Sequence, residues 1–202
     1  MRILTASLLP LGLSLVAPTA AGAATAEITV RGADGKPLAG AVVMIDTPKK
    51  VAGPIHFTWG TEMAQRNIAF DPHVLIVPVG ATVTFPNKDK VRHHVYSFSR
   101  VKSFNLKLYG AGEVPSVVFD KPGVVALGCN IHDSMSGFLL VVDTPFAMQT
   151  DANGHVSISG LPAGAATVRL WHPAIHAPEN TLSQPVIVTA AGFATTYTVR
   201  GK

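Results

Sequence analysis

The sequence predicts an all-β protein made of two β-sandwiches. Short apolar or alternating stretches recur along the 202 residues, with turn residues between them at intervals of about ten residues, which is typical of a sandwich. The 18 glycines and 15 prolines argue against a helix bundle. An apolar content of 48% with only 14% charged residues is enough for one or two folded domains and is unlike a disordered tail.

Each predicted strand is a stretch of β-branched, aromatic or alternating apolar residues bounded by Gly, Pro, Asn or Asp. Only Thr61–Asn67 has a weakly helical composition, with a loop or an irregular strand as the alternative. In chain order the predicted strands are Ile28–Val30, Ala41–Ile45, Val74–Val79, Thr82–Phe85, His94–Phe98, Ser116–Phe119, Val124–Leu127, Phe138–Val142, Val156–Ile158, Thr167–Trp171, Val186–Val188 and Thr195–Val199.

The first 26 residues have the three-part pattern of a secretory signal peptide. Arg2 is followed by an apolar run over Ile3–Val16, and small residues then lead to Ala24-Thr25-Ala26. We expect cleavage after Ala26, with Ala24 as an alternative, and a mature protein in a bacterial periplasm with no membrane anchor. The alternative is an uncleaved anchor, for which the run is short.

The chain has one cysteine, which excludes an internal disulfide and a multi-cysteine zinc site. In an oxidising compartment such a cysteine is either buried and idle or held by a ligand. The formal charge of +4 comes without a dense Lys/Arg block, so the sequence does not indicate nucleic-acid binding.

Two segments that lie far apart in the sequence carry Gly-rich turn motifs of a similar kind. Asp34-Gly35-Lys36-Pro37-Leu38-Ala39-Gly40 forms a turn between apolar runs, and Thr150-Asp151-Ala152-Asn153-Gly154 precedes Gly160-Leu161-Pro162-Ala163-Gly164. Together they resemble the carboxypeptidase regulatory-like domain, a seven-stranded sandwich related to transthyretin. The resemblance covers roughly Glu27–Asp46 and Thr144–Arg200. It implies a domain in two parts, 27–48 and 144–202, interrupted by an inserted domain at 49–143.

The inserted segment contains a pattern of metal ligands. Cys129, His132 and Met135 are spaced Cys-x2-His-x2-Met, and His93-His94-Val95 lies in a strand-like run upstream. One thiolate, two imidazoles and one weak thioether are the ligand set of a blue copper site. The alternative is that Cys129 is a buried apolar residue.

The sequences that flank these residues resemble a cupredoxin of the plastocyanin and amicyanin group, over about Phe57–Asp143. They are Asn67-Ile68-Ala69-Phe70-Asp71-Pro72, Val79-Gly80-Ala81-Thr82-Val83-Thr84-Phe85-Pro86-Asn87, Val118-Phe119-Asp120-Lys121-Pro122-Gly123 and Gly137-Phe138-Leu139-Leu140-Val141-Val142. The resemblance implies a Greek-key β-sandwich that binds one type 1 copper ion through His93, Cys129, His132 and Met135. The layout of this chain, a cupredoxin inserted in a regulatory-like domain, resembles that of methylamine-utilisation proteins.

The upstream ligand is either His93 or His94. The family motif His-Asn-Val assigns His93 when Val95 is aligned, and strand alternation places His93 and Val95 on one face. A slip of one residue would make His94 the ligand. His94 stands where the family has an asparagine that braces the ligand loop, so Asn130 is the alternative brace.

The resemblance implies a non-enzymatic carrier of single electrons, with His132 as the exit and Phe85, Phe98 and Phe138 as apolar walls. The alternative is a periplasmic copper-binding or copper-delivery protein, and a third reading is a metal-free adhesion or carbohydrate-binding sandwich. A redox protein, such as a cytochrome or a dehydrogenase, is the expected partner. Basic residues near the His93 strand either steer an acidic partner or form a solvated face; they are Lys88, Lys90, Arg92, Arg100, Lys102 and Lys107.

Overall fold

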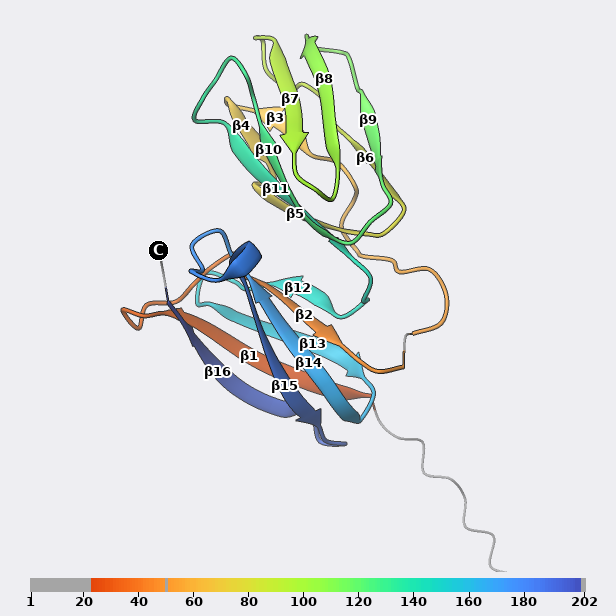
Figure 1. Cartoon of the computed structure of the whole chain (residues 1–202), viewed down its shortest axis with the longest axis vertical. Coiled ribbons are helices and arrows are strands. Elements are labelled where there is room, and N and C mark those ends of the chain that lie inside the picture. Colours follow the sequence, from red (N-terminus) through yellow and green to blue (C-terminus); the bar gives the residue numbers. More distant parts are fainter. Residues whose placement is uncertain (1–22, 50, 201–202) are drawn as a thin grey trace, which may run out of the picture.

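The computed structural model describes residues 23–49 and 51–200, and it confirms the all-β prediction. The described residues form β1 to β16 and one short 3-10 turn at Pro178–Asn180. The strands are arranged as two sandwiches stacked along the long axis of the molecule (Figure 1). In the described ranges no helix is long and apolar enough to span a membrane. Most of the expected signal peptide, residues 1–22, lies outside the described residues.

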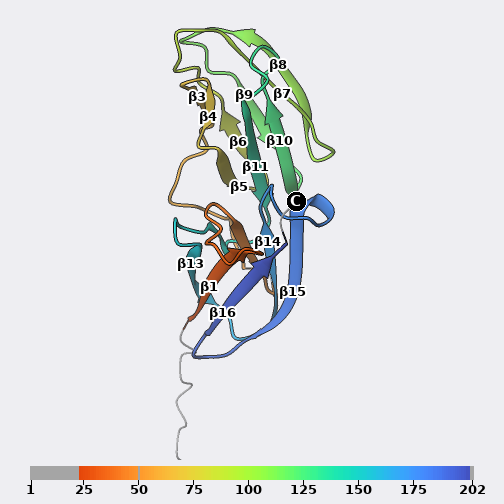
Figure 2. The ribbon, with the colours of Figure 1, turned by 90° about the vertical axis from the view of Figure 1, so that its left-hand side faces the viewer.

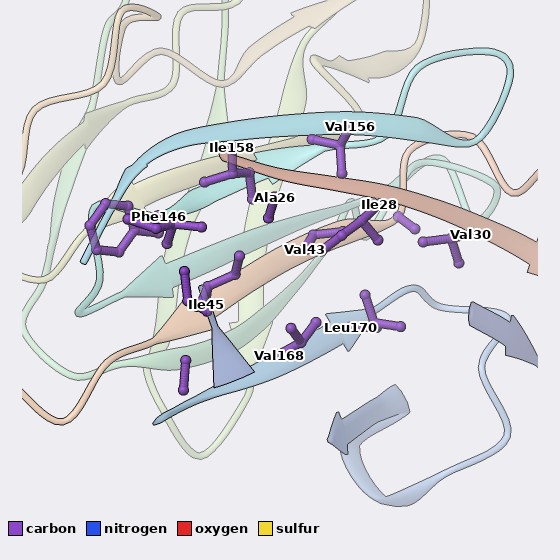
Figure 3. Close-up of a cluster of buried hydrophobic side chains, with 14 of the residues drawn as sticks. Ala26, Ile28, Val30, Val43, Ile45, Phe146, Val156, Ile158, Val168 and Leu170 are labelled. Atoms are coloured by element: carbon purple, nitrogen blue, oxygen red, sulfur yellow. The ribbon is translucent and has the colours of Figure 1, made fainter. Parts of the chain in front are cut away.

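The sandwich at the chain ends has one three-stranded and one four-stranded sheet. Its core lies between the two sheets and includes Ile28 and Val30 from β1, Ile45 from β2 and Leu170 from β14 (Figure 3). The sheets, in strand order, are β13 (His155–Leu161), β1 (Ala24–Gly32) and β16 (Phe193–Val199), and β12 (Ala147–Gln149), β2 (Val42–Asp46), β14 (Gly164–Trp171) and β15 (Thr181–Val188).

The segment between β2 and β12 forms the other sandwich. Its core includes Phe85, Val95, Phe119 and Leu139, together with Cys129. One layer has five strands, in the order β5 (Val74–Pro78), β11 (Ser136–Val142), β10 (Gly123–Gly128), β7 (His93–Phe98) and β8 (Ser103–Tyr109). The other layer has the pairs β3 (Ala64–Arg66) with β4 (Ala69–Asp71) and β6 (Ala81–Thr84) with β9 (Ser116–Phe119), joined by bridges Glu62–Thr84 and Gln65–Asn87.

The two sandwiches share an apolar interface. The outer face of β5 and β11 packs against β2, β12 and β14, where Trp171 is almost fully buried. Both views show β5 and β11 at this junction (Figures 1 and 2). Trp59 donates from Nε1 to the Ile76 carbonyl, and Gln149 donates from Nε2 to the Val74 carbonyl, so side chains satisfy the outer edge of β5.

The chain leaves the terminal sandwich after Asp46 and returns at Asp143, and one arginine binds both residues. Arg169 on β14 pairs with the Asp46 carboxylate at 2.5 and 2.8 Å and approaches Asp143 at 3.8 Å. The hydrogen bonds to Asp46 raise the pKa of Arg169, against the effect of burial. The repeated Asp-Thr-Pro at the two crossings therefore places two carboxylates on one guanidinium.

Four strands were not predicted, and the weak helical prediction at Thr61–Asn67 is wrong. That segment contains β3, which pairs with β4, so pairing overrides the local preference of Ala64-Gln65-Arg66. β4, β8 and β12 were the other omissions.

Candidate metal centre

The candidate ligands lie at one end of the middle sandwich, where loops join the two layers. Cys129 directly follows β10, and His132 and Met135 lie in the short connection to β11. His93 is the first residue of β7, which pairs with β10 at Tyr96–Gly128. Pairing of these two neighbouring strands brings a residue 36 positions upstream of the cysteine to the same place.

His93, Cys129 and His132 converge around one point. Cys129 Sγ lies 4.0 Å from His93 Nδ1 and 3.7 Å from His132 Nδ1, and all three donor atoms lie within 4.8 Å of one another. Metal bonds to imidazole nitrogen and thiolate sulfur are about 2.0 and 2.3 Å long, so one ion can bond both atoms of either S–N pair. The donor set and spacing therefore fit a metal ion.

Burial at the site is graded. His93 is 0% exposed and Cys129 is 3% exposed, whereas His132 is partly exposed. The rings of His93 and His132 have centroids 5.0 Å apart at an interplanar angle of 58°. A buried sulfur and a buried imidazole with one ring open to the surface form a shielded centre with a single accessible edge.

Met135 is buried in the same core cluster as Cys129. Its backbone N–H donates to the His132 carbonyl at 2.9 Å, which closes a tight turn between the two residues. The structure thus places the thioether residue in the core that also holds the cysteine, and its role as a fourth ligand remains a prediction.

The two upstream histidines face opposite ways, as strand alternation predicts. His93 and Val95 are buried, whereas His94 lies on the outer face and its Nε2 is 2.7 Å from Asn105 Oδ1. Of the two, His93 is the histidine grouped with Cys129 and His132. That His93 acts as a ligand is still a prediction.

Asp89 holds the other side of the His93 ring. Its Oδ2 lies 2.7 Å from His93 Nε2, and its carboxylate also accepts the backbone N–H groups of Asn67 and Ile68 at 2.7 and 3.0 Å. Burial raises the pKa of Asp89, but the hydrogen bonds from Ile68, His93 and Asn67 outweigh it and hold the pKa below its ordinary value. Because the ionised carboxylate only accepts, it fixes the hydrogen of a neutral His93 on Nε2 and leaves Nδ1 facing Cys129.

The turn that donates to Asp89 has an unusual backbone. Asn67 and Ile68 have φ values of 53° and 56°, in the left-handed region. This conformation is rare for a β-branched residue and costs on the order of 1–3 kcal/mol. The strained turn between β3 and β4 aims two adjacent N–H groups at one carboxylate.

A buried polar group ties the layers together beneath the site. The Tyr109 hydroxyl lies 2.6 Å from Gln65 Oε1 and 2.8 Å from the Phe85 carbonyl, and can donate to either. Burial raises the pKa of Tyr109 far above its usual value, so the phenol stays neutral. Asn87 donates to the carbonyls of Val91 and Tyr109 and accepts from Asp89 N–H, which fixes the loop that carries Asp89.

Some expected contributions to the site are corrected. Phe98 is 83% exposed and lies on the outer face of β7, so it is not a wall of the site, whereas Phe85 is buried in the core. Phe138 packs on the other sandwich. Asn130 is exposed and makes no side-chain hydrogen bond to any described residue, so it does not brace the loop.

Asp89, Gln65 and Tyr109 were missed by the sequence analysis. Asp89 precedes His93 by four residues, and a carboxylate close to a candidate histidine ligand was an available signal. Gln65 and Tyr109 carried no such signal, because they are each other's partners and lie 44 positions apart in the sequence.

No family model matches this chain, and no curated protein matches it significantly. Among solved structures it is similar to a purple cupredoxin from Nitrosopumilus maritimus, at 26% identity and a TM-score of 0.39, over 41% of this chain and 100% of that one. It is also similar to a copper-containing nitrite reductase from Thermus scotoductus SA-01, at 28% identity and a TM-score of 0.39, over 48% of this chain and 25% of that chain. A reduced amicyanin variant shows 22% identity and a TM-score of 0.38, over 50% of this chain and 98% of that chain. Each of these similarities covers half of this chain or less.

Proposed function

We propose that the middle sandwich binds one type 1 copper ion and carries single electrons between redox partners. The observation that supports this most directly is the buried Cys129 sulfur with two imidazole nitrogens at 3.7 and 4.0 Å. A soft thiolate with two imidazoles selects copper over hard cations. In this proposal His93, Cys129 and His132 are the main ligands, and Met135 is the weak fourth one.

Each ligand has a distinct task. Cys129 supplies the thiolate, and its burial keeps that sulfur away from oxidants and disulfide partners. His93 is held by Asp89 with Nδ1 directed at the sulfur. His132, the partly exposed ligand, is the edge through which an electron could pass to a partner. When bound, copper would supply a one-electron couple between Cu(II) and Cu(I).

The fold supports a carrier because it fixes the ligand positions before any metal binds. Cys129 and Met135 belong to a packed core, and His93 is held from both sides by the core and by Asp89. If the ligand positions are the same in both oxidation states, little structural rearrangement opposes the transfer of an electron. We propose no enzymatic activity, since the donor set leaves no group to act as an acid or base on a substrate.

The same proposal covers the layout of the chain. We propose a periplasmic protein whose regulatory-like sandwich, 27–48 and 144–202, carries a cupredoxin domain at 49–143. This division is supported by β2 pairing with β12 and β14, across about a hundred intervening residues. A role in methylamine utilisation is part of the proposal and rests on the sequence resemblance alone.

The test is a titration of the purified metal-free protein with Cu(II). We expect an intense blue or purple colour at one equivalent, from charge transfer between the Cys129 thiolate and the ion. Cys129→Ser should abolish the colour, because serine offers no thiolate. The matched control is Ser134→Ala in the same loop, which should keep the colour. A copper-loaded wild-type protein without colour would contradict the proposal.

The second candidate is a copper-delivery protein, which is favoured by the exposed edge of His132. The two functions make different predictions for the loaded protein. A carrier should be reduced and reoxidised repeatedly and keep its copper in the presence of an acceptor apoprotein. A delivery protein should lose Cu(I) to that acceptor.

A further inference from the structure

The outer face of the five-stranded sheet is only half covered. The β5 and β11 side packs on the terminal sandwich, whereas the β7 and β8 side has no cover among the described residues. There β7 presents His94, Tyr96 and Phe98 in a row, with ring centroids 5.6 and 5.1 Å apart. We call these three residues the β7 aromatic strip. Phe98, at 83%, is the most exposed large apolar residue described.

A hollow of about 340 Å³ runs beside the strip, between β7 and β10. Its walls are Tyr96 and Phe98 on one side and the small residues Ala126 and Gly128 on the other. A Cβ on Gly128 would lie 2.7 Å from Tyr96 Cζ, so only glycine lets the ring rest on β10. The Tyr96 hydroxyl makes no hydrogen bond to the described part of the chain, so it is available to a partner.

The surroundings of the strip are basic. From Lys90 to Gly112 the sequence has five cationic residues and no Asp or Glu. Arg100 and Lys107 are exposed and form no ion pair with any described residue, whereas Lys102 pairs with Asp120 at 3.3 Å. An exposed aromatic centre surrounded by a polar, cationic rim is typical of protein interfaces.

We propose that the β7 aromatic strip, its hollow and this basic rim form the docking surface for an acidic redox protein. The charge of the rim selects an acidic partner and disfavours a second copy of this cationic chain. The inference rests on the proposed electron-carrier function and names where, and with what kind of protein, that function is exercised. A small interface of this kind fits a transient encounter, as electron carriers need.

The location also connects the surface with the metal centre. The Tyr96 ring lies directly on Gly128, and Gly128 is bonded to Cys129. A partner on the strip would therefore be separated from the cysteine by one ring and one peptide unit. The exchange would move one electron between the centre and the partner's own redox group, with no bond made or broken.

The test uses two probes that share a fold and differ in charge: mitochondrial cytochrome c, which is basic, and its succinylated form, which is acidic. Each is titrated into the ¹⁵N-labelled mature chain and followed by backbone chemical shifts, with and without Cu(I). We expect the succinylated form to perturb β7, β8 and residues 126–128, and to bind about tenfold or more tightly than the basic form at low ionic strength. Added salt should weaken this binding.

Variants of the surface separate the aromatic and the charged contributions. Phe98→Ser should weaken binding by about fivefold or more, and so should the double variant Arg100→Glu, Lys107→Glu. Lys36→Glu, a single charge reversal on the other sandwich that makes half this change in net charge, should bind like wild type. Because these side chains are exposed, thermal melts should show that every variant folds.

The docking proposal is wrong if the shifts centre on residues 129–135, if the variants bind like wild type, or if neither cytochrome binds. Since binding is measured with and without metal, it is independent of the copper titration. A chain that docks the acidic probe at the strip but holds no copper would refute the proposed function alone.

Discussion

Asp89, which is not one of the proposed ligands, holds the ring of His93. Its carboxylate joins the strained Asn67-Ile68 turn to the ring of His93 through three hydrogen bonds. The left-handed Ile68 is a cost in backbone energy that persists because the surrounding structure holds it. The turn, the carboxylate and the imidazole therefore act as one unit that presents Nδ1 to the sulfur.

If the proposed copper site forms, replacing the Asp89 carboxylate should change copper binding without removing any of the proposed ligands. In Asp89→Asn the hydrogen bond to His93 becomes weaker and neutral, so the imidazole becomes a poorer donor. We expect copper affinity to fall by about 10–100-fold and the reduction potential to rise, because Cu(II) loses more than Cu(I) does. Chelator competition and voltammetry measure the two effects. Asp120→Asn, an exposed carboxylate paired with Lys102, is the control, and equal potentials in both variants would contradict this role.

At the residue scale, what could be predicted from the sequence depended on local spacing. Cys129, His132 and Met135 lie within seven residues, and alternation along β7 was enough to separate the directions of His93 and His94. Asn87, Gln65 and Tyr109 could not be predicted, because they meet through contacts between segments that are distant in sequence. Phe98 was misjudged although the same alternation places it on the outer face with His94, and not on the buried face of His93.

At the element scale, β1 bears on where the proposed signal peptide would be cut. Ala24 and Ala26 are buried, and Ala26 pairs with Phe193 on β16. Gly192 lies so close to the backbone of Thr25 that an added Cβ would be 2.0 Å from its carbonyl oxygen. Cleavage after Ala26 would remove two buried and paired residues, Ala24 and Ala26, from this strand.

We therefore predict that the secreted protein begins at Ala24, where Ala21-Gly22-Ala23 supplies the small residues that a signal peptidase requires. Intact-mass measurement of protein secreted to the periplasm would locate the cut. A chain engineered to begin at Glu27 should melt at a lower temperature than one beginning at Ala24, since it lacks part of the β1–β16 pairing. A native chain that begins at Glu27 would show that the cut falls after Ala26 as first expected.

The strands that were not predicted share a physical reason for the missing signal in their sequence. β3 and β12 are three-residue strands rich in Ala, Gln and Met or Arg, which favour helices, and they form because neighbouring strands bind them. In β8 the alternation of Phe104 and Leu106 breaks at Lys107, whose φ of 56° turns Leu108 outward and Tyr109 into the core. The period-2 signal is lost at such an irregularity although the strand continues.

At the scale of the whole molecule, Arg169 contacts both places where the chain passes between the sandwiches, Asp46 and Asp143. Arg169→Ala would remove the guanidinium that pairs with Asp46 and lies 3.8 Å from Asp143. We expect a loss of about 1–2 kcal/mol in unfolding free energy, because the pair is bidentate and its side chains are mostly buried. Urea unfolding measures it, with Lys36→Ala, which removes an exposed pair with Asp34, as a control that should change little. Equal effects of the two variants would mean that the crossing has no special role.

Acid should destabilise the whole fold through its turn carboxylates. The pKa of Asp151 is lowered, chiefly by the backbone N–H of His155, and that of Asp34 is lowered, chiefly by the N–H of Lys36. Since their folded pKa values lie below the ordinary value of 3.8, the unfolded chain binds more protons at low pH. Their stabilisation is therefore complete above that value and is lost as pH falls through the folded pKa values.

We expect the urea midpoint of the metal-free protein to vary little with these groups near neutral pH and to fall steadily below about pH 4. Asp151→Asn can still accept the N–H groups of Asn153 and His155, which lie 2.8 Å from Oδ1, but it cannot titrate. This variant should therefore unfold near the wild-type midpoint at pH 3 or lower and lose part of the wild-type advantage at neutral pH, so that its pH dependence is shallower. An unchanged slope would show that Asp151 contributes nothing to the acid sensitivity of the fold.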